Sequence, residues 1–174
     1  MGKIFGIGLG KTGLRSLHRA LELLGYNSLH SGGLEALRSV FRAIDEGRHL
    51  LDYLDPELDA FVDIAPIRLY FYLADVEYPG SRFILTARGL DDWLDSRSRH
   101  AESQSGGRPD LDRWRAEYVE HEAVVRSYFT DRPDDLLVLD VARESAWERL
   151  CEFLGCPVPQ VPFPWENRSP AHVR

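Results

Sequence analysis

A glycine-rich turn near the start of the chain carries residues that can hold a phosphate group. The turn runs Gly8-Leu9-Gly10-Lys11-Thr12-Gly13-Leu14-Arg15-Ser16, after an apolar run and before an amphipathic segment. Backbone N–H groups at the start of a helix gather around the positive end of the helix dipole and bind anions. Lys11 adds a point charge, and Thr12 and Ser16 add hydroxyl groups. The turn therefore predicts a site for a phosphate-bearing ligand.

Two common nucleotide motifs fit this turn only in part. The segment from Gly8 to Gly13 satisfies G-x-G-x-x-G, but a dinucleotide site also needs an Asp or Glu about 20 residues later. The chain has Tyr26-Asn27-Ser28-Leu29-His30 there. A nucleoside-triphosphate loop would begin with a glycine where this chain has Phe5. Asp140, which ends an apolar run, would supply the magnesium ligand of a divergent kinase, and this interpretation stays open.

Acid–base candidates follow other apolar runs. Asp63 comes at the end of such a run and would face the same edge of a parallel sheet as the glycine turn, because ligands bind at the carboxyl ends of the strands. It is the first candidate for a general base, and capping of the following helix is the alternative role. His30, on a short segment after the first helix, is the second candidate. His121 lies on the apolar stripe of a long helix, a position more typical of a core residue, and is the third candidate.

Alternating strand and helix patterns would position these side chains. Four apolar runs predict buried parallel strands, because they are apolar at successive positions: Ile4–Gly8, Ala60–Ile64, Arg82–Ala87 and Leu136–Asp140. Helical periodicity falls between them, over residues 17–24, 34–44, 111–128 and 147–154. Gly25 and Gly155 should end the first and last helices, and Ser145 with Glu148 should form a capping box. The pattern predicts an α/β fold in three layers, a central parallel β-sheet flanked by helices.

Two segments differ from this pattern. Residues 98–109 are polar and contain two glycines and a proline, which predicts a mobile loop. Residues 156–174 carry five prolines and cannot form a helix or a central strand. We expect them to form an extended tail that packs Phe163 and Trp165 onto the domain.

The composition limits the classes of partner. A chain of 174 residues that is 44% hydrophobic suits one domain spanning residues 1–174. Its net charge of −7 argues against nucleic acid and anionic membranes as partners. Two cysteines are too few for a disulfide framework or a zinc site, and no signal segment or bilayer-spanning run is evident. We therefore expect a cytoplasmic protein, and the sequence does not give its oligomeric state.

Several separated segments together resemble the P-loop sulfotransferase-like family, and most closely its short bacterial and fungal type. They are IFGIGLGKTGLRSLHRALELLGY at 4–26, FVDIAP at 61–66, YPGSRFILTAR at 78–88, WERLCEFLG at 147–155, and PFP at 162–164 with Asn167. The segments follow the family's order and span nearly the whole chain. The resemblance implies a P-loop-type fold. It also implies transfer of a sulfuryl group from 3′-phosphoadenosine 5′-phosphosulfate (PAPS) to a hydroxyl or amine of a small-molecule acceptor, without a metal.

The resemblance also implies roles for single residues. The 5′-phosphosulfate would be held by the turn, through Lys11, Thr12, Gly13, Leu14, Arg15 and Ser16. Lys11 would also stabilise the negative charge that develops on the leaving oxygen. Asp63 or His30 would deprotonate the acceptor.

The same resemblance assigns the other end of the donor and the acceptor side. Arg88 and Ser96, eight residues apart, resemble the pair that binds the 3′-phosphate. A surface ion pair of Arg88 with Asp91 or Asp92 is the alternative. The segment at 98–109 would help to close over the acceptor.

The chain departs from the family pattern within the turn. Many members carry Thr or Ser where this chain has Leu14 and Arg15. Leu14 keeps its backbone N–H but offers no hydroxyl, and Arg15 would either bind the phosphate or point outward. A non-catalytic nucleotide-binding or scaffold protein on the same fold therefore remains an alternative to the enzyme.

Overall fold

Five parallel strands form one sheet at the centre of the molecule. The computed structural model describes residues 2–105, 109–143 and 145–166. The strands lie in the order β2-β3-β1-β4-β5, with the bounds β1 Ile4–Gly6, β2 Ser28–His30, β3 Ala60–Val62, β4 Arg82–Thr86 and β5 Leu136–Leu139. Phe5 of β1 is level with Phe61 and Phe83 on the neighbouring strands, and their rings stack at centroid distances of 5.8 and 5.3 Å.

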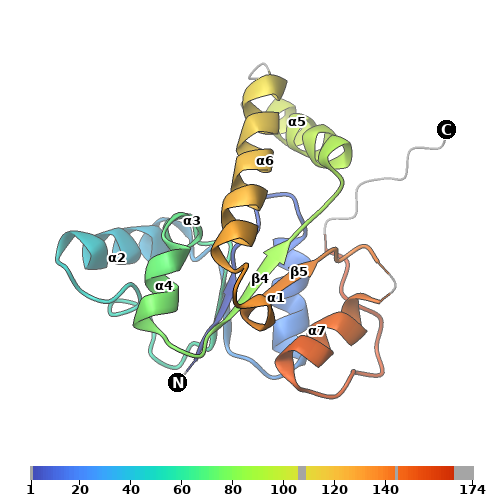
Figure 1. Cartoon of the computed structure of the whole chain (residues 1–174). Coiled ribbons are helices and arrows are strands. Elements are labelled where there is room, and N and C mark those ends of the chain that lie inside the picture. The colour runs from blue at the N-terminus through green and yellow to red at the C-terminus, as the bar shows by residue number, and fades with distance from the viewer. Residues whose placement is uncertain (1, 106–108, 144, 167–174) are drawn as a thin grey trace.

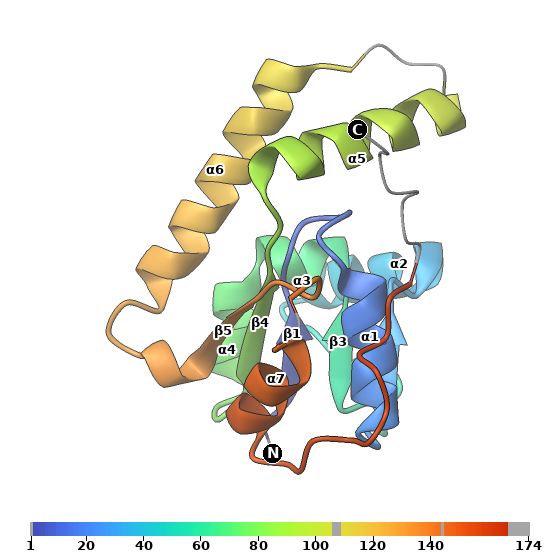
Figure 2. The ribbon, with the colours of Figure 1, turned by 90° about the vertical axis from the view of Figure 1, so that its right-hand side faces the viewer.

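Helices cover both faces of the sheet, as Figures 1 and 2 show. One face packs against α1 (Leu14–Leu23) and α7 (Ala146–Leu154), through buried side chains such as Leu17, Leu21 and Leu150. The other face packs against α2 (Gly33–Asp45), α3 (Ala65–Leu69), α4 (Phe71–Glu77) and the end of α6 (Leu111–Tyr128). A 3-10 turn at Pro133–Asp135 precedes β5. The predicted three-layer α/β fold with a parallel sheet is confirmed.

Helix α5 (Leu90–Ser105) follows β4 and lies across the carboxyl end of the sheet (Figure 2). A third apolar cluster joins it to α6 and to the glycine turn, through Leu9, Trp93, Leu94 and Tyr118. No helix in the described part of the chain is long and apolar enough to cross a membrane.

The apolar runs located four strands correctly, although each strand is shorter than its run. The sequence did not identify β2 as a strand, because it has only three residues, of which two are polar, and lies at the edge of the sheet. Gly25 and Gly155 follow α1 and α7 with positive φ angles of 90° and 70°, as predicted. The capping box was wrong. Ser145 makes no capping hydrogen bond, because its φ of −85° and ψ of 17° lie outside the extended region from which a capping side chain reaches the first turn.

Two further predictions need correction. The expected loop at 98–109 is helical as far as Ser105, and the Ser98 hydroxyl donates to the carbonyl of Leu94 one turn earlier. Residues 106–108 lie outside the described part of the chain. The tail has no helix or strand over residues 156–166, and Phe163 packs on Trp147 at 4.8 Å between ring centroids. Trp165 is 53% exposed, and residues 167–174 are not described.

Candidate functional site

The glycine turn is folded tightly onto the end of β4. The hydroxyl of Thr12 donates to the carbonyl oxygen of Leu9 at 2.6 Å, and its Oγ1 lies 2.5 Å from Oγ1 of Thr86. Because the Leu9 carbonyl can only accept, the Thr86 hydroxyl donates to Thr12. The Thr12 N–H also bonds to Leu9. Both polar groups of Thr12 therefore shape the turn.

Two glycines allow this close approach. A Cβ added at Gly8 would lie 2.1 Å from Oγ1 of Thr86. A Cβ added at Gly13 would lie 2.3 Å from Cγ2 of Val141, and Gly13 has a φ of 106° that side-chain-bearing residues rarely adopt. The turn therefore packs against the residues that end β4 and follow β5, which places the start of α1 at the carboxyl edge of the sheet.

The start of α1 offers unpaired backbone N–H groups. Its cap residue is Gly13, and no described side chain caps it. The first N–H groups of a helix have no partner within the helix, so those of residues 14–16 are available to an anion. The Leu14 side chain is buried in the core. The Ser16 hydroxyl oxygen accepts a hydrogen bond from the Glu166 N–H of the tail at 3.0 Å.

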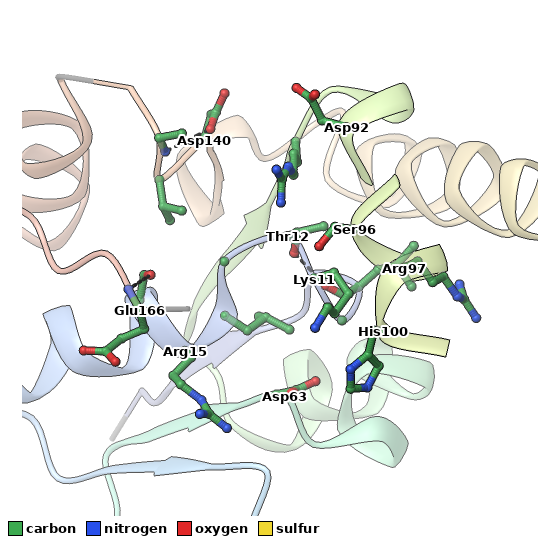
Figure 3. A pocket seen from close by; sticks show the side chains of 18 of the residues that line it. Lys11, Thr12, Arg15, Asp63, Asp92, Ser96, Arg97, His100, Asp140 and Glu166 are labelled. Carbon is green, nitrogen blue, oxygen red and sulfur yellow. Dashed lines mark hydrogen bonds between the residues drawn. The ribbon is translucent and has the colours of Figure 1, made fainter. Parts of the chain in front are cut away.

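A cavity of about 950 Å³ opens between this turn, the ends of β2 and β3, and α5 (Figure 3). Every residue that the sequence analysis assigned to the site lines it: Lys11, Thr12, Gly13, Leu14, Arg15, Ser16, His30, Asp63, Arg88 and Ser96. The structure thus brings together four segments that are far apart in the sequence. In Figure 3 the side chains of Lys11 and Asp63 point into the same part of the cavity.

Asp63 and His30 form a pair because their strands are neighbours. His30 ends β2 level with Val62 of β3, and Asp63 follows directly. Nε2 of His30 lies 3.6 Å from Oδ2 of Asp63. Asp63 also has a left-handed φ of 61°, which Asp tolerates better than most residues. The expected alternative of helix capping is not supported, since α3 has Ile64 as its cap residue and no side-chain capping bond.

Burial moves the pKa values of this pair toward each other. It raises the pKa of Asp63, an effect that the nearby His30 and Arg68 oppose. Burial lowers the pKa of His30, which the Asp63 carboxylate opposes. Desolvation of this kind favours the neutral form of both groups. A carboxylate with a raised pKa takes up a proton more readily than an ordinary aspartate, as a general base requires.

Tyr118 fixes the backbone of Arg88, and Arg88 lines the cavity. The Tyr118 hydroxyl of α6 accepts from the Arg88 N–H at 3.3 Å and donates to the Arg88 carbonyl. Within the described residues Arg88 forms no ion pair with Asp91 or Asp92, and Asp91 pairs with Arg115 instead. The surface-pair alternative for Arg88 is therefore not supported. Burial lowers the pKa of Lys11, and the charges of Arg15 and Arg88 lower it further, so these cations lie close together.

Ser96 lies on the same side of the cavity. It is 8% exposed and lies on α5, six residues after the helix begins at Leu90.

The sequence analysis missed several residues that line the cavity, including Arg68, Arg97, His100, Glu117 and Glu166. Nη1 of Arg97 lies 2.7 Å from Oε2 of Glu117, which links α5 to α6. The Arg97 guanidinium also stacks on two tryptophans, 5.0 Å from the Trp93 ring centroid and 4.7 Å from that of Trp114. His100 escaped notice because residues 98–109 were expected to be a loop, and Arg97 directly precedes that segment. Arg68 could have been predicted, because it lies on the short helix that directly follows the candidate base Asp63.

Neither of the two other nucleotide interpretations gains support. Oδ1 of Asp140 accepts from the Ala142 N–H at 3.0 Å and Oδ2 lies 3.3 Å from Arg143, so this carboxylate is occupied within its own turn. No three acidic, His or Cys residues of the described part of the chain are grouped as metal ligands. Strand β3 lies between β1 and β2, whereas the usual dinucleotide fold places the second strand beside the first.

A family comparison agrees with this fold. The sequence model of the Sulfotransferase domain family matches residues 3–107 and 99–172. These ranges cover nearly the whole chain, including the glycine turn and Asp63, Arg88 and Ser96. The chain therefore belongs to the Sulfotransferase domain family. No curated protein matches this chain at the sequence level.

Proposed function

We propose that this protein is a sulfotransferase that moves a sulfuryl group from PAPS to a hydroxyl or amine of a small-molecule acceptor. One observation carries the proposal. The start of α1 with Lys11, the pair of Asp63 and His30, and Arg88 with Ser96 all line one cavity. These are the three groups that such a transfer needs: an anion site, a base and a second phosphate site. Membership of the Sulfotransferase domain family supports the same chemistry.

The residues fit a donor with anionic groups at two places. The N–H groups of residues 14–16, with Lys11 and Arg15, would hold the 5′-phosphosulfate. Arg88 would bind the 3′-phosphate as a charge-assisted fork, with Ser96 beside it on the cavity wall. The cavity volume of about 950 Å³ suits a nucleotide together with a small acceptor. PAPS supplies an activated sulfuryl group whose leaving group is a phosphate.

The chain's own residues would handle charge and proton. As the acceptor oxygen or nitrogen forms its bond to sulfur, the sulfur–oxygen bond to the leaving phosphate breaks. Lys11 would meet the negative charge that develops on that phosphate oxygen. Asp63 would take the acceptor's proton, and His30 is the second candidate for this step. The proposal assigns no metal, and it takes a small molecule rather than nucleic acid or a membrane as the partner.

A nucleotide-binding protein without transfer activity is the second candidate. It is favoured by Leu14, whose side chain lies in the core and gives the cavity no hydroxyl. If this candidate is correct, the nucleotide left after PAPS loses its sulfuryl group should bind, but PAPS should not be turned over. If the protein is a divergent kinase, ATP with magnesium should bind better than any 3′-phosphorylated nucleotide.

Calorimetric titration with 3′-phosphoadenosine 5′-phosphate (PAP), beside ADP, ATP–magnesium and NAD, tests the proposal. We expect PAP to bind selectively and Arg88→Ala to weaken it by at least about tenfold, or about 1.4 kcal/mol. ADP affinity should not change in this variant. Arg126→Ala is the matched control, because Arg126 pairs with Glu122 outside the cavity. Failure of PAP to bind, or a preference for ATP–magnesium that Arg88→Ala leaves intact, would contradict the proposal.

A further inference from the structure

Arg68 lines the cavity, and its guanidinium forms no hydrogen bond within the described part of the chain. It lies on α3 with 18% of its side chain exposed, and Nη1 is 3.9 Å from Oδ1 of Asp63. That separation is too long for a hydrogen bond, and the guanidinium makes none within the described residues. Every fully buried side-chain nitrogen or oxygen in the described part of the chain has a partner. The unpaired N–H groups of Arg68 must therefore open to the cavity that this residue lines.

Within the described residues, the ion pair that Arg68 forms is the long one with Asp63, at 3.9 Å. Arg97 is the neighbouring cation, and it already has a short contact of 2.7 Å with Glu117 and two tryptophan rings. Asp63 is the nearest carboxylate, but the proposed reaction needs it as a base. Burial lowers the pKa of Arg68, which Asp63 and Glu117 oppose, yet a guanidinium stays protonated in proteins. A charged fork with open N–H groups thus faces the cavity beside the proposed base.

The position of Arg68 indicates which ligand would use it. The proposed donor already has its own cations, namely Lys11 and Arg15 for one end and Arg88 for the other. Arg68 lies on α3, which follows β3 and Asp63, whereas Arg88 follows β4, and β1 lies between these two strands. A ligand group bound by Arg68 would therefore belong to the molecule whose hydroxyl or amine faces Asp63, which is the acceptor.

We propose that the acceptor carries an anionic group, a carboxylate or a sulfate or phosphate ester, which Arg68 binds while the acceptor's hydroxyl or amine faces Asp63. This inference rests on the proposed function, since it names the substrate class of the same site. A planar guanidinium fork matches two oxygens of such an anion, and this geometry gives specificity as well as affinity. Neutral acceptors of equal shape would leave the fork unpaired and bind more weakly.

The test uses the full chain saturated with PAP, so that the donor's phosphate sites are filled. Calorimetry then compares 4-hydroxyphenylacetate with its neutral isostere 4-hydroxyphenylacetamide, and inorganic sulfate serves as a competitor. We expect the acid to bind at least about tenfold more tightly than the amide, and sulfate to displace it. Arg68→Met should remove the preference, and Arg68→Lys should keep part of it. Arg126→Met, outside the cavity, should leave it unchanged.

The outcomes separate this inference from the proposed function. Equal affinity for acid and amide, binding of neither, or a preference that survives Arg68→Met overturns the anion subsite. PAP affinity should stay within about twofold in every Arg68 variant. If the wild-type protein does not bind PAP, that result contradicts the donor site and not the anion subsite. In that case the acid, the amide and sulfate are compared without PAP, and loss of the preference in Arg68→Met still supports the subsite. Thermal unfolding checks the fold, and Arg68→Gln replaces Arg68→Met if the latter unfolds.

Discussion

The indole N–H of Trp93 donates to the carbonyl oxygen of Gly10 at 2.8 Å. This bond joins α5 to the glycine turn across the carboxyl edge of the sheet. Trp93 is fully buried and packs on Tyr118, with 4.9 Å between the ring centroids. Tyr118 in turn holds the backbone of Arg88. Two aromatic residues in contact thus fix the turn and Arg88 relative to each other, as a ligand with two anionic ends requires.

Trp93→Phe should loosen this connection. The variant keeps most of the ring but removes the N–H, which leaves the Gly10 carbonyl without its donor. We expect the free energy of unfolding to fall by about 1–3 kcal/mol, and PAP affinity to fall with it because the turn is no longer fixed. Urea unfolding and calorimetry measure the two effects. Trp114→Phe is the matched control, since Trp114 also contacts Arg97 but forms no hydrogen bond with the glycine turn in the described part of the chain. Unchanged PAP affinity in Trp93→Phe would show that this bond does not position the turn.

Gly13→Ala and Gly10→Ala should differ strongly in stability although both lie in the turn. Gly13 has φ 106° and a Cβ there would meet Val141, whereas a Cβ at Gly10 meets nothing within 4 Å. Backbone strain alone costs about 1–3 kcal/mol at such a position, and the contact with Val141 adds to it. We expect Gly13→Ala to lower the urea midpoint clearly and Gly10→Ala to leave it nearly unchanged.

A double variant separates the two causes. Val141→Ala removes the steric contact but not the strain, so Gly13→Ala combined with Val141→Ala should recover only part of the loss. Full recovery in the double variant would mean that the left-handed backbone contributes nothing at Gly13. Equal effects of Gly10→Ala and Gly13→Ala would mean that neither cause distinguishes the two positions.

The sequence was sufficient for those parts of the fold that apolar burial determines. Strands buried on both faces have apolar side chains at successive positions, so β1, β3, β4 and β5 could be located. β2 could not, because an edge strand with Ser28 and His30 lacks that pattern. The length of α5 was missed for a related reason. Only Trp93 and Leu94 of this helix are buried hydrophobic residues, so a mostly polar composition was read as a loop.

Residues of the candidate site were predictable where they lie in the segment that follows a strand. Lys11, Asp63 and Arg88 come after β1, β3 and β4, and the carboxyl ends of parallel strands share one edge. Contacts that depend on how helices or the tail pack were not predictable. The ion pair of Arg97 with Glu117 and the bond from Glu166 to Ser16 join segments 20 and 150 residues apart, and no local spacing signals them.

Asp63→Asn should separate binding from transfer. The variant keeps the size of the side chain but removes the base, so we expect transfer of labelled sulfate from PAPS to 4-hydroxyphenylacetate or water to fall by about 10²–10⁴-fold. PAP affinity should be retained. In the wild type, transfer should fall as the pH drops through the pKa of Asp63, because only the carboxylate accepts a proton. Since burial raises that pKa, the decline should begin above the ordinary range of an aspartate, about 3.9.

His30→Gln decides between the two candidate bases. If Asp63 is the base, His30→Gln should retain most of the transfer activity, and the decline at low pH should persist. Loss of transfer in His30→Gln together with retention in Asp63→Asn would assign the base to His30 instead. Both variants are compared at equal PAP saturation, so that differences in donor binding do not enter.

His121 should make the protein less stable in mild acid. Its Nε2 lies 2.7 Å from the Ile7 carbonyl oxygen, which can only accept, so Nε2 carries the proton and Nδ1 is the atom that titrates. Burial lowers the pKa of His121, and Arg68 lowers it further, while the bond to Ile7 and the charges of Glu122 and Glu117 oppose this. The folded protein therefore binds a proton at His121 less readily than the unfolded chain does.

The sign of the pH dependence follows from that difference. Below about pH 6.5 the unfolded chain takes up a proton that the folded protein refuses, so the free energy of unfolding falls by up to about 1.4 kcal/mol per pH unit for each such histidine. His30 adds to this effect, because burial lowers its pKa as well. His121→Gln retains a donor for Ile7 but cannot titrate. The free energy of unfolding, measured with urea from about pH 7.5 to about pH 5.5, one unit on either side of about 6.5, should therefore have a smaller slope against pH in this variant. His49→Gln, at an exposed position, should keep the wild-type slope. Equal slopes in all three proteins would mean that protonation of His121 is not coupled to unfolding.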